Sequence, residues 1–123
     1  GFGLLGHLVE MVRASEVDVE LVLDAVPMMD GAEDTVRAGI VSSLQPQNVR
    51  LRRAVANLEE AGQDPRYPLI FDPQTAGGLL ASVPADRADA CVAKLKELGY
   101  ARTMIVGEVK EQSDRLEPIT VKV

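Results

Sequence analysis

Two different hydrophobic periods alternate along this chain of 123 residues, and this alternation restricts the folds that it can form. Residues 4–12 carry apolar side chains at the spacing of one helix face, with polar side chains on the other side. Residues 17–23 then alternate apolar and acidic side chains, which is the period of a half-buried strand. Interleaved helices and strands predict an α/β (α+β) domain, a layered mixed β-sheet covered by helices.

Turn and capping residues divide the rest of the chain into further elements. Residues 32–38 are predicted to form a short helix, with Asp30 as its N-cap and Gly39 as its end. Residues 40–47 fit neither period. Two longer helices are predicted, one behind Pro46 that ends at Gly62, and the clearest over residues 84–98, ended by Gly99, with Ala88, Cys91, Val92 and Leu95 on one face. The remaining strands are predicted at residues 68–71, 79–83, 103–109 and 118–123.

The composition limits the function classes that the chain can belong to. Hydrophobic residues make up 46% and aromatic residues only 3%, so we expect an aliphatic core, with Met28, Met29 and Met104 inside it. A net charge of -6 disfavours nucleic acid and anionic membranes as partners. The single cysteine, Cys91, excludes an internal disulfide, and we expect it to be an unreactive apolar residue of a cytoplasmic protein. No apolar run approaches the roughly 20 residues that span a bilayer, and no signal peptide opens the chain.

A glycine-rich motif, Gly1-Phe2-Gly3-Leu4-Leu5-Gly6-His7, leads into the first helix. Glycines at a helix start let the backbone approach a ligand closely, and the free N–H groups there suit a phosphate. A tight structural turn explains the same residues without a ligand. His7 is the only histidine, and we expect it to be structural, with Glu10 at helical spacing beside it.

A second motif, Asp72-Pro73-Gln74-Thr75-Ala76-Gly77-Gly78-Leu79-Leu80, interrupts an apolar stretch. Adjacent glycines within such a stretch indicate a close backbone approach or a bulge. Asp72 could equally cap the turn that follows it. The basic run Arg50-Leu51-Arg52-Arg53 is predicted to be a solvated helix face, with a phosphate-facing patch as the alternative.

The two motifs, taken together and in this order, resemble selenophosphate synthetase (selenide, water dikinase). Asn48-Val49-Arg50, the helix behind Pro84 and Val106-Gly107-Glu108-Val109 are also similar to that family. The second motif departs at Ala76, where the family commonly has serine. The resemblance covers nearly the whole chain, but only the C-terminal domain of the family, which belongs to the aminoimidazole ribonucleotide synthetase superfamily.

The resemblance implies an enzyme that makes selenophosphate, AMP and orthophosphate from selenide, ATP and water, with Mg²⁺ and usually K⁺. It implies that residues 1–123 are one C-terminal domain whose partner is an N-terminal ATP-binding domain, which carries the catalytic residues and the main homodimer contact. The first motif normally follows Thr-Asp-Val-Thr, so a magnesium ligand is expected just upstream of Gly1 and none within the chain. Gly1 and Gly3 are then expected near the phosphates, and Asp72, Thr75, Gly77 and Gly78 are expected to shape the cleft between the domains, with a structural role as the alternative.

Two other hypotheses stay open at this point. One is the C-terminal domain of a related ATP-using enzyme of hydrogenase maturation, thiamine-phosphate phosphorylation or purine synthesis. The other is a stand-alone domain that only binds a partner protein. An upstream Cys or selenocysteine followed closely by Lys would favour the selenium enzyme over both.

Overall fold

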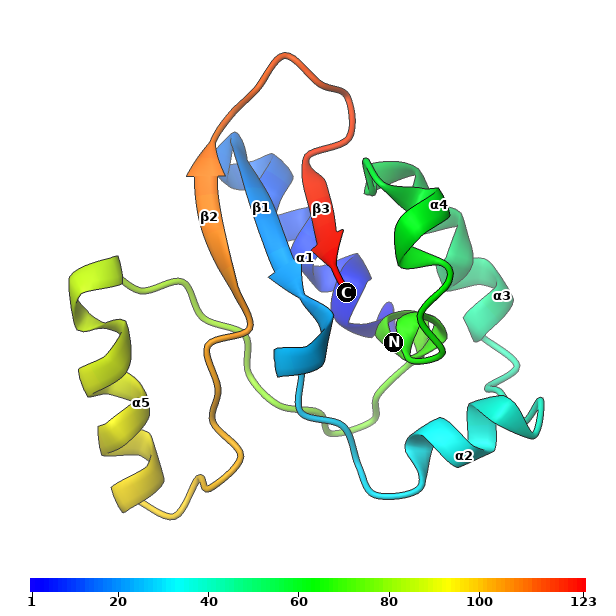
Figure 1. The fold of residues 1–123 in the computed structure, drawn as a ribbon, viewed down its shortest axis with the longest axis horizontal. Helices are drawn as coiled ribbons and strands as arrows, with labels where there is room; N and C mark the ends of the chain where they lie inside the picture. The colour runs from blue at the N-terminus through cyan, green and yellow to red at the C-terminus, as the bar shows by residue number, and fades with distance from the viewer.

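A small three-stranded sheet lies at the centre of the computed structural model, which describes residues 1–123 (Figure 1). The strand order is β2-β1-β3. The strands are β1 (Val17–Val22), β2 (Gly107–Glu111) and β3 (Ile119–Lys122). β1 pairs antiparallel with β2, with Val19 opposite Val109, and parallel with β3, with Val19 opposite Ile119. The mixed sheet and the helices around it confirm the predicted α+β class.

Helix α1 (Gly3–Ser15) covers one face of this sheet, behind the strands in Figure 1. The spacing of its apolar residues places Leu5, Leu8, Val9 and Val12 on the buried side. The other helical elements are η1 (Leu23–Ala25), α2 (Ala32–Arg37), α3 (Gln45–Asn48), η2 (Val49–Ala54), α4 (Leu58–Ala61), η3 (Tyr67–Phe71), η4 (Ala85–Arg87) and α5 (Ala88–Glu97), where η denotes a 3₁₀ helix.

A single core of 15 buried residues joins α1 to the sheet and to η3. From the strands it takes the side chains whose period-2 alternation points them at α1, namely Val19, Leu21, Ile119 and Val121. Apart from Tyr67 and Phe71 the core is aliphatic, as the composition predicts. The opposite face of the sheet carries polar and charged side chains, and no helix packs on it. The prediction of a sheet covered by helices is therefore correct for one face only.

The prediction of a strand at residues 68–71 is wrong. This segment is the 3₁₀ helix η3, in which Tyr67, Ile70 and Phe71 are buried. A spacing of three to four residues between buried side chains belongs to a helical turn and not to a strand. Tyr67 and Phe71 stack edge to face, with ring centroids 5.1 Å apart.

Three further predictions of extended structure and packing need correction. Residues 79–83 pair with no strand, and Leu79 is fully exposed. The strand predicted at residues 103–109 begins only at Gly107. The helix predicted over residues 84–98 is divided into η4 and α5. Its predicted apolar face, formed by Ala88, Cys91, Val92 and Leu95, is half-buried, and no residue of α5 is fully buried.

Several smaller predictions can also be checked. Asp30 does not cap α2 but forms an ion pair with Arg102 at 3.1 Å. Met29 and Met104 are exposed, whereas Met28 packs against the core. The helix behind Pro46 is divided into α3, η2 and α4, because Val55 is extended and bridges to Ile119 of β3. Gly62 caps α4 as predicted. No helix is long and apolar enough to cross a membrane.

Candidate functional site

The two glycine-rich motifs meet where the start of α1 crosses η3. Gly3 has a φ of +73°, and a Cβ placed on it would lie 2.7 Å from the carbonyl carbon of Phe71 and 2.8 Å from the carbonyl oxygen of Ile70. No side chain fits in that space, and the left-handed backbone independently favours glycine. Close approach therefore explains Gly3, and it brings the first motif against the residues directly before Asp72.

Asn48 ties the two motifs together. Its Nδ2 donates to the carbonyl oxygen of Gly1 at 2.8 Å and to that of Phe71 at 2.9 Å. One turn earlier in α3, Gln45 donates from Nε2 to the carbonyl oxygen of Pro68 at 2.9 Å. Both amides are buried, so each hydrogen bond satisfies a donor that has lost water. α3 thus fixes both ends of η3 and the first residue of the chain.

The N-terminus of α1 leaves its first backbone N–H groups without a side-chain cap. The N-cap residue is Phe2, which offers no cap hydrogen bond, and the first turn has no acidic residue. Such an end carries partial positive charge and suits an anion. Gly6 allows Leu51 and the Phe2 side chain to pack against this turn, because a Cβ on Gly6 would collide with Cβ of Phe2. The Phe2 ring lies 5.6 Å from that of His7.

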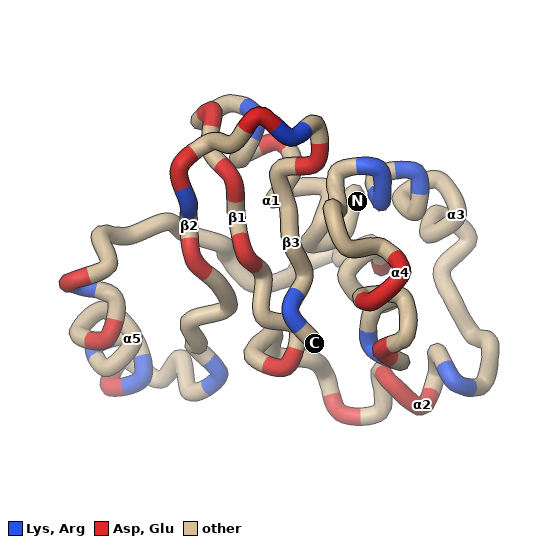
Figure 2. The backbone as a smooth tube through the Cα atoms, turned by 45° about the horizontal axis from the view of Figure 1, so that its top comes forward, with Lys and Arg blue, Asp and Glu red and all other residues tan.

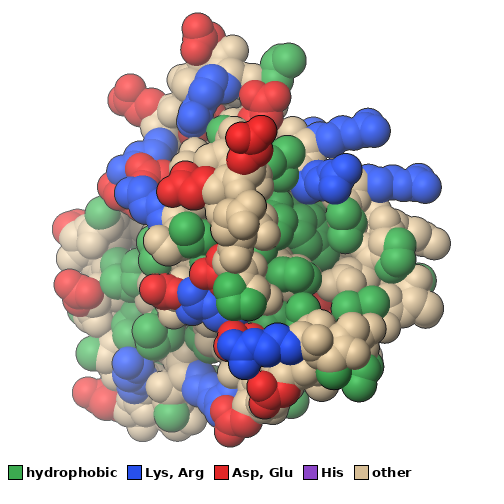
Figure 3. All heavy atoms as spheres, turned by 45° about the vertical axis from the view of Figure 1, so that its right-hand side comes forward, with side chains coloured by type: hydrophobic (Ala, Val, Ile, Leu, Met, Phe, Trp, Pro, Cys, Tyr) green, Lys and Arg blue, Asp and Glu red, His purple; other side chains and the backbone are tan.

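The basic run in η2 lies beside this end of α1. Arg50, Arg52 and Arg53 are exposed, and none of them forms an ion pair or a side-chain hydrogen bond within the chain. Figure 2 shows basic residues beside the N-terminus, in the segment between α3 and α4. Basic side chains project from this side of the molecule (Figure 3). The run is solvated, as predicted, and its charge also lies close to the uncapped helix end.

The structure places the other predicted site residues in the loop that follows η3. Asp72 accepts a hydrogen bond at Oδ2 from Nε2 of Gln74, at 3.2 Å. Thr75, Gly77 and Gly78 are exposed, and neither glycine has a positive φ. A Cβ on Gly1 would meet nothing within 4 Å, so at that position no steric reason for glycine exists within the chain. The roles of Gly1, Gly3, Asp72, Thr75, Gly77 and Gly78 toward a ligand stay predictions.

Sequence reasoning missed Asn48 and Gln45 as parts of this site. A signal was present: they stand three residues apart in a short helix, so they share one face, and Asn48 belongs to the tripeptide that resembles the selenophosphate synthetase family. Their partners are backbone carbonyls 23 or more residues away, which no local pattern reveals.

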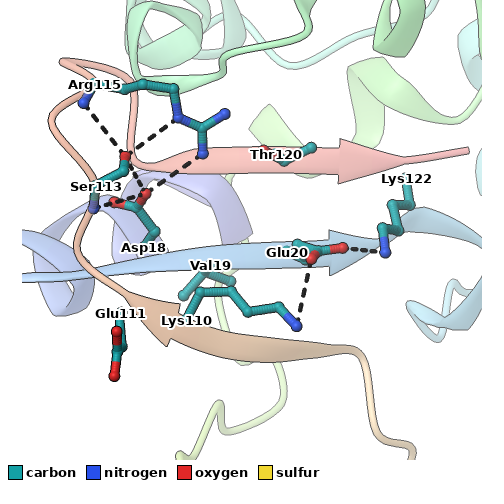
Figure 4. Close-up of a pocket in the computed structure, with 9 residues that line it drawn as sticks. All are labelled: Asp18, Val19, Glu20, Lys110, Glu111, Ser113, Arg115, Thr120 and Lys122. Carbon is teal, nitrogen blue, oxygen red and sulfur yellow. Dashed lines mark hydrogen bonds and ion pairs between the residues drawn. The ribbon is translucent and has the colours of Figure 1, made fainter.

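The open face of the sheet carries a second cluster, also missed from the sequence (Figure 4). It lines a pocket of about 480 Å³ formed by Asp18, Val19, Glu20, Lys110, Glu111, Ser113, Arg115, Thr120 and Lys122. Asp18 is buried, and its Oδ2 accepts a 2.5 Å hydrogen bond from the Ser113 hydroxyl, which holds the pKa of Asp18 below its usual value. The alternating pattern of residues 17–23 predicted a half-buried strand here and gave no sign of this cluster.

Ion pairs occupy the charged groups of this second cluster other than Glu111. Glu20 contacts Lys122 and lies 3.5 Å from Lys110, and the hydrogen bond from Lys122 is the main cause of the lowered pKa of Glu20. Lys110 also donates to Glu108 at 2.6 Å. Because the charges already neutralise one another, this face is a structural network, and the region where the motifs meet is the better candidate site.

No group of three or more His, Cys, Asp or Glu side chains is gathered so that it could hold a metal ion. His7 is exposed on α1 and its Nδ1 lies 3.5 Å from Oε2 of Glu10, and its structural role stays a prediction. Cys91, on α5, is half-buried. The residues of this chain therefore fit an anion at the start of α1 and do not by themselves fit a divalent cation.

Comparison with known proteins defines the class of protein to which this fold and these motifs belong. The profile of the AIR synthase related protein, C-terminal domain, matches residues 1–117, and the chain belongs to that family. It is similar to selenide, water dikinases. That of Clostridioides difficile is 37% identical over 119 residues, covering 94% of this chain and 33% of that protein. That of Geobacter metallireducens is 38% identical over 107 residues, covering 87% and 31%.

A third relative, the selenide, water dikinase of Clostridium botulinum (strain Eklund 17B / Type B), is 35% identical over 127 residues, covering 99% of this chain and 34% of that protein. The chain thus spans about a third of the length of the curated relatives it matches.

Proposed function

We propose that this chain is the C-terminal domain of a selenide, water dikinase. Such an enzyme makes selenophosphate from selenide, ATP and water, releasing AMP and orthophosphate: one phosphoryl group is transferred to selenium, and water takes up the other. The similarity to proteins named selenide, water dikinase, which extends over nearly the whole chain, is the observation that carries the proposal. It favours this enzyme over the other ATP-using relatives and over a stand-alone binding domain.

The chain's own contribution is proposed to be part of the wall around the polyphosphate. The uncapped N–H groups at the start of α1, near Gly1 and Gly3, would face phosphate oxygens, since backbone donors at a helix end bind anions without moving. Asn48 would hold this end in register with the loop that carries Asp72, Thr75, Gly77 and Gly78. Positioned in this way, the loop would line the cleft that faces the rest of the enzyme.

The catalytic groups are proposed to lie outside these residues, in an N-terminal ATP-binding domain that would also form the main contact of a cytoplasmic homodimer. Mg²⁺, with K⁺, would neutralise phosphate charge. Since no cluster of ligands for a divalent metal exists within the chain, its ligands would come from that domain. No step of the reaction is assigned to a side chain of residues 1–123.

The experiment that tests this proposal uses the full-length protein that contains these residues. AMP formation from ATP is followed by chromatography with and without selenide under anaerobic conditions. The proposal predicts AMP only when selenide is supplied. AMP formation that does not depend on selenide, or no AMP formation when selenide is present, would exclude the proposal.

A further inference from the structure

One edge of the sheet is unpaired. β2 is an outer strand, and it forms backbone hydrogen bonds only with β1. In Figure 1 the next element on its outer side is α5, and no backbone hydrogen bond joins the two. Glu108, Val109 and Glu111 are exposed, with Val109 at 49%. An unpaired edge of this kind is a template for another strand.

The opposite edge of the sheet, along β3, is protected, so β2 is the edge strand that lacks a backbone partner. The amide of Ala56 donates to the carbonyl of Ile119 at 2.8 Å. The side chain of Asn57 donates to the carbonyl of Val121 at 2.7 Å and accepts from its N–H at 2.9 Å. The fold therefore covers the β3 edge with its own chain and leaves the β2 edge uncovered.

The alternation of hydrogen-bonded pairs along the β1–β2 ladder identifies which backbone N–H and C=O groups of β2 are free. The amide of Val22 donates to the carbonyl of Val106, and these two residues are directly opposite in the register. Hydrogen-bonded pairs alternate in an antiparallel ladder, so residues 106, 108 and 110 point their backbone groups at β1. Gly107, Val109 and Glu111 consequently direct their N–H and C=O groups outward.

The charge of Glu108 on β2 is only partly compensated within one chain, because its one ion-pair partner, Lys110, is shared with Glu20. Glu108 lies directly opposite Glu20 of β1, and like charges at that position are destabilising. Lys110 is shared between these two carboxylates, 2.6 Å from Glu108 and 3.5 Å from Glu20. A further positive charge directly beside Glu108 on the outer side would relieve this repulsion.

We propose that β2 pairs antiparallel with β2 of a second copy of this chain, with Val109 opposite Val109 of the second copy. In that register the outward groups of Gly107, Val109 and Glu111 form about six inter-strand hydrogen bonds. Glu108 and Lys110 fall opposite Lys110 and Glu108 of the second copy, at the closer, non-hydrogen-bonded positions. One short segment thus complements itself in hydrogen bonding and in charge, as a two-fold symmetric interface requires.

The interface is small, so the dimer is weak. Two five-residue strands bury less than the standard area of a stable complex, and we expect a dissociation constant on the order of 100 μM. This surface is independent of the proposed activity, because it lies on β2 and touches none of the residues near the start of α1.

Sedimentation equilibrium of the 123-residue chain over a range of concentrations tests the proposal, with circular dichroism to verify that each variant keeps its fold. The chain should show a monomer–dimer equilibrium. Val109→Pro removes one outward N–H without touching the β1 ladder and should abolish the dimer, whereas the isosteric Val109→Thr keeps that N–H and should dimerise as the parent chain does.

Charge reversal tests the register itself. Glu108→Lys or Lys110→Glu alone places like charges opposite each other and should weaken the dimer about tenfold or more. The double variant exchanges the two charges, restores complementarity across the two-fold axis and should recover dimerisation. A double variant as weak as the worse single variant would overturn the register.

A monomeric parent chain at millimolar concentration would overturn the proposal entirely. The chain's own residues 79–83, which no strand pairs, are the alternative occupant of the β2 edge. Hydrogen exchange separates the two cases: protection of the Val109 amide that is independent of concentration would assign the edge to the chain itself, and protection that rises with concentration supports the second copy.

Discussion

Asn48 donates a 2.9 Å hydrogen bond to the backbone carbonyl of Phe71, and with the same nitrogen it holds Gly1. One buried amide therefore joins two segments that lie far apart in the sequence, the start of the first glycine-rich motif and the residue before the second. The candidate site depends on this junction more than on the glycines themselves, because only Gly3 of the predicted phosphate residues is sterically required.

Replacing Asn48 tests this junction. Asn48→Ala leaves two carbonyls without their donor, and we expect the free energy of unfolding to fall by about 2 kcal/mol. Urea denaturation measures the change. Gln47→Ala is the matched control, an exposed amide in the same helix with no side-chain hydrogen bond, and it should change stability by less than about 0.5 kcal/mol. Equal effects of the two substitutions would contradict the role of Asn48.

Gly3→Ala tests the close approach of α1 to η3. The added methyl group would overlap the backbone of Phe71 at a residue with positive φ, so we expect a loss of about 2–4 kcal/mol. Gly31→Ala is the control: Gly31 also has a positive φ, but nothing lies within 4 Å of its added Cβ, and a loss of about 1 kcal/mol is expected. The difference between the two isolates the steric contact, and no difference would refute it.

Asp18 makes the stability of the chain depend on pH in the acidic range. Its pKa in the folded state is lowered, chiefly by the Ser113 hydroxyl, so its contribution is fully present above the unfolded pKa of about 3.9 and is lost as the pH falls through the folded value. Asp18→Asn should make the fall of unfolding free energy below about pH 4 shallower. Asp114→Asn, which replaces an exposed carboxylate without an ion pair in the loop that carries Ser113, should leave that slope as it is.

We expect residues 1–123 alone to bind ATP only weakly, with a dissociation constant above about 1 mM. The helix end offers backbone donors, but the arginines beside it are solvated and no cluster of metal ligands is present. Isothermal titration calorimetry with and without Mg²⁺ measures this. Tight, magnesium-dependent binding would show that the nucleotide site is complete within the chain.

Local patterns predicted the elements whose residues repeat in a regular way. The helical spacing of residues 4–12 gave α1, and the strict alternation of residues 17–23 gave β1 within one residue of its end. Short apolar runs were less informative. The apolar run of residues 68–71 fits a strand and a 3₁₀ turn equally well in the sequence. Its packing against Gly3 in the folded chain selects the 3₁₀ turn.

Local sequence patterns also predicted only part of the candidate site. The two motifs could be found from the sequence because glycine marks close backbone approach, but their meeting point depends on Asn48 and Gln45, whose partners are distant carbonyls. The alternation of residues 17–23 placed Asp18 only in a half-buried strand, and the return of Ser113 from the loop between β2 and β3 makes it a buried hydrogen-bond acceptor. Tertiary contacts of this kind have no local signature.

The central claim, that this chain belongs to an enzyme that joins phosphate to selenium, is tested most directly by identifying the product. The full-length protein is incubated with ATP, Mg²⁺ and ⁷⁷Se-labelled selenide, and the mixture is observed by ³¹P NMR. The account predicts a new phosphorus resonance split by direct coupling to ⁷⁷Se, together with AMP and orthophosphate. A spectrum in which ATP is consumed but no phosphorus resonance couples to selenium would contradict it.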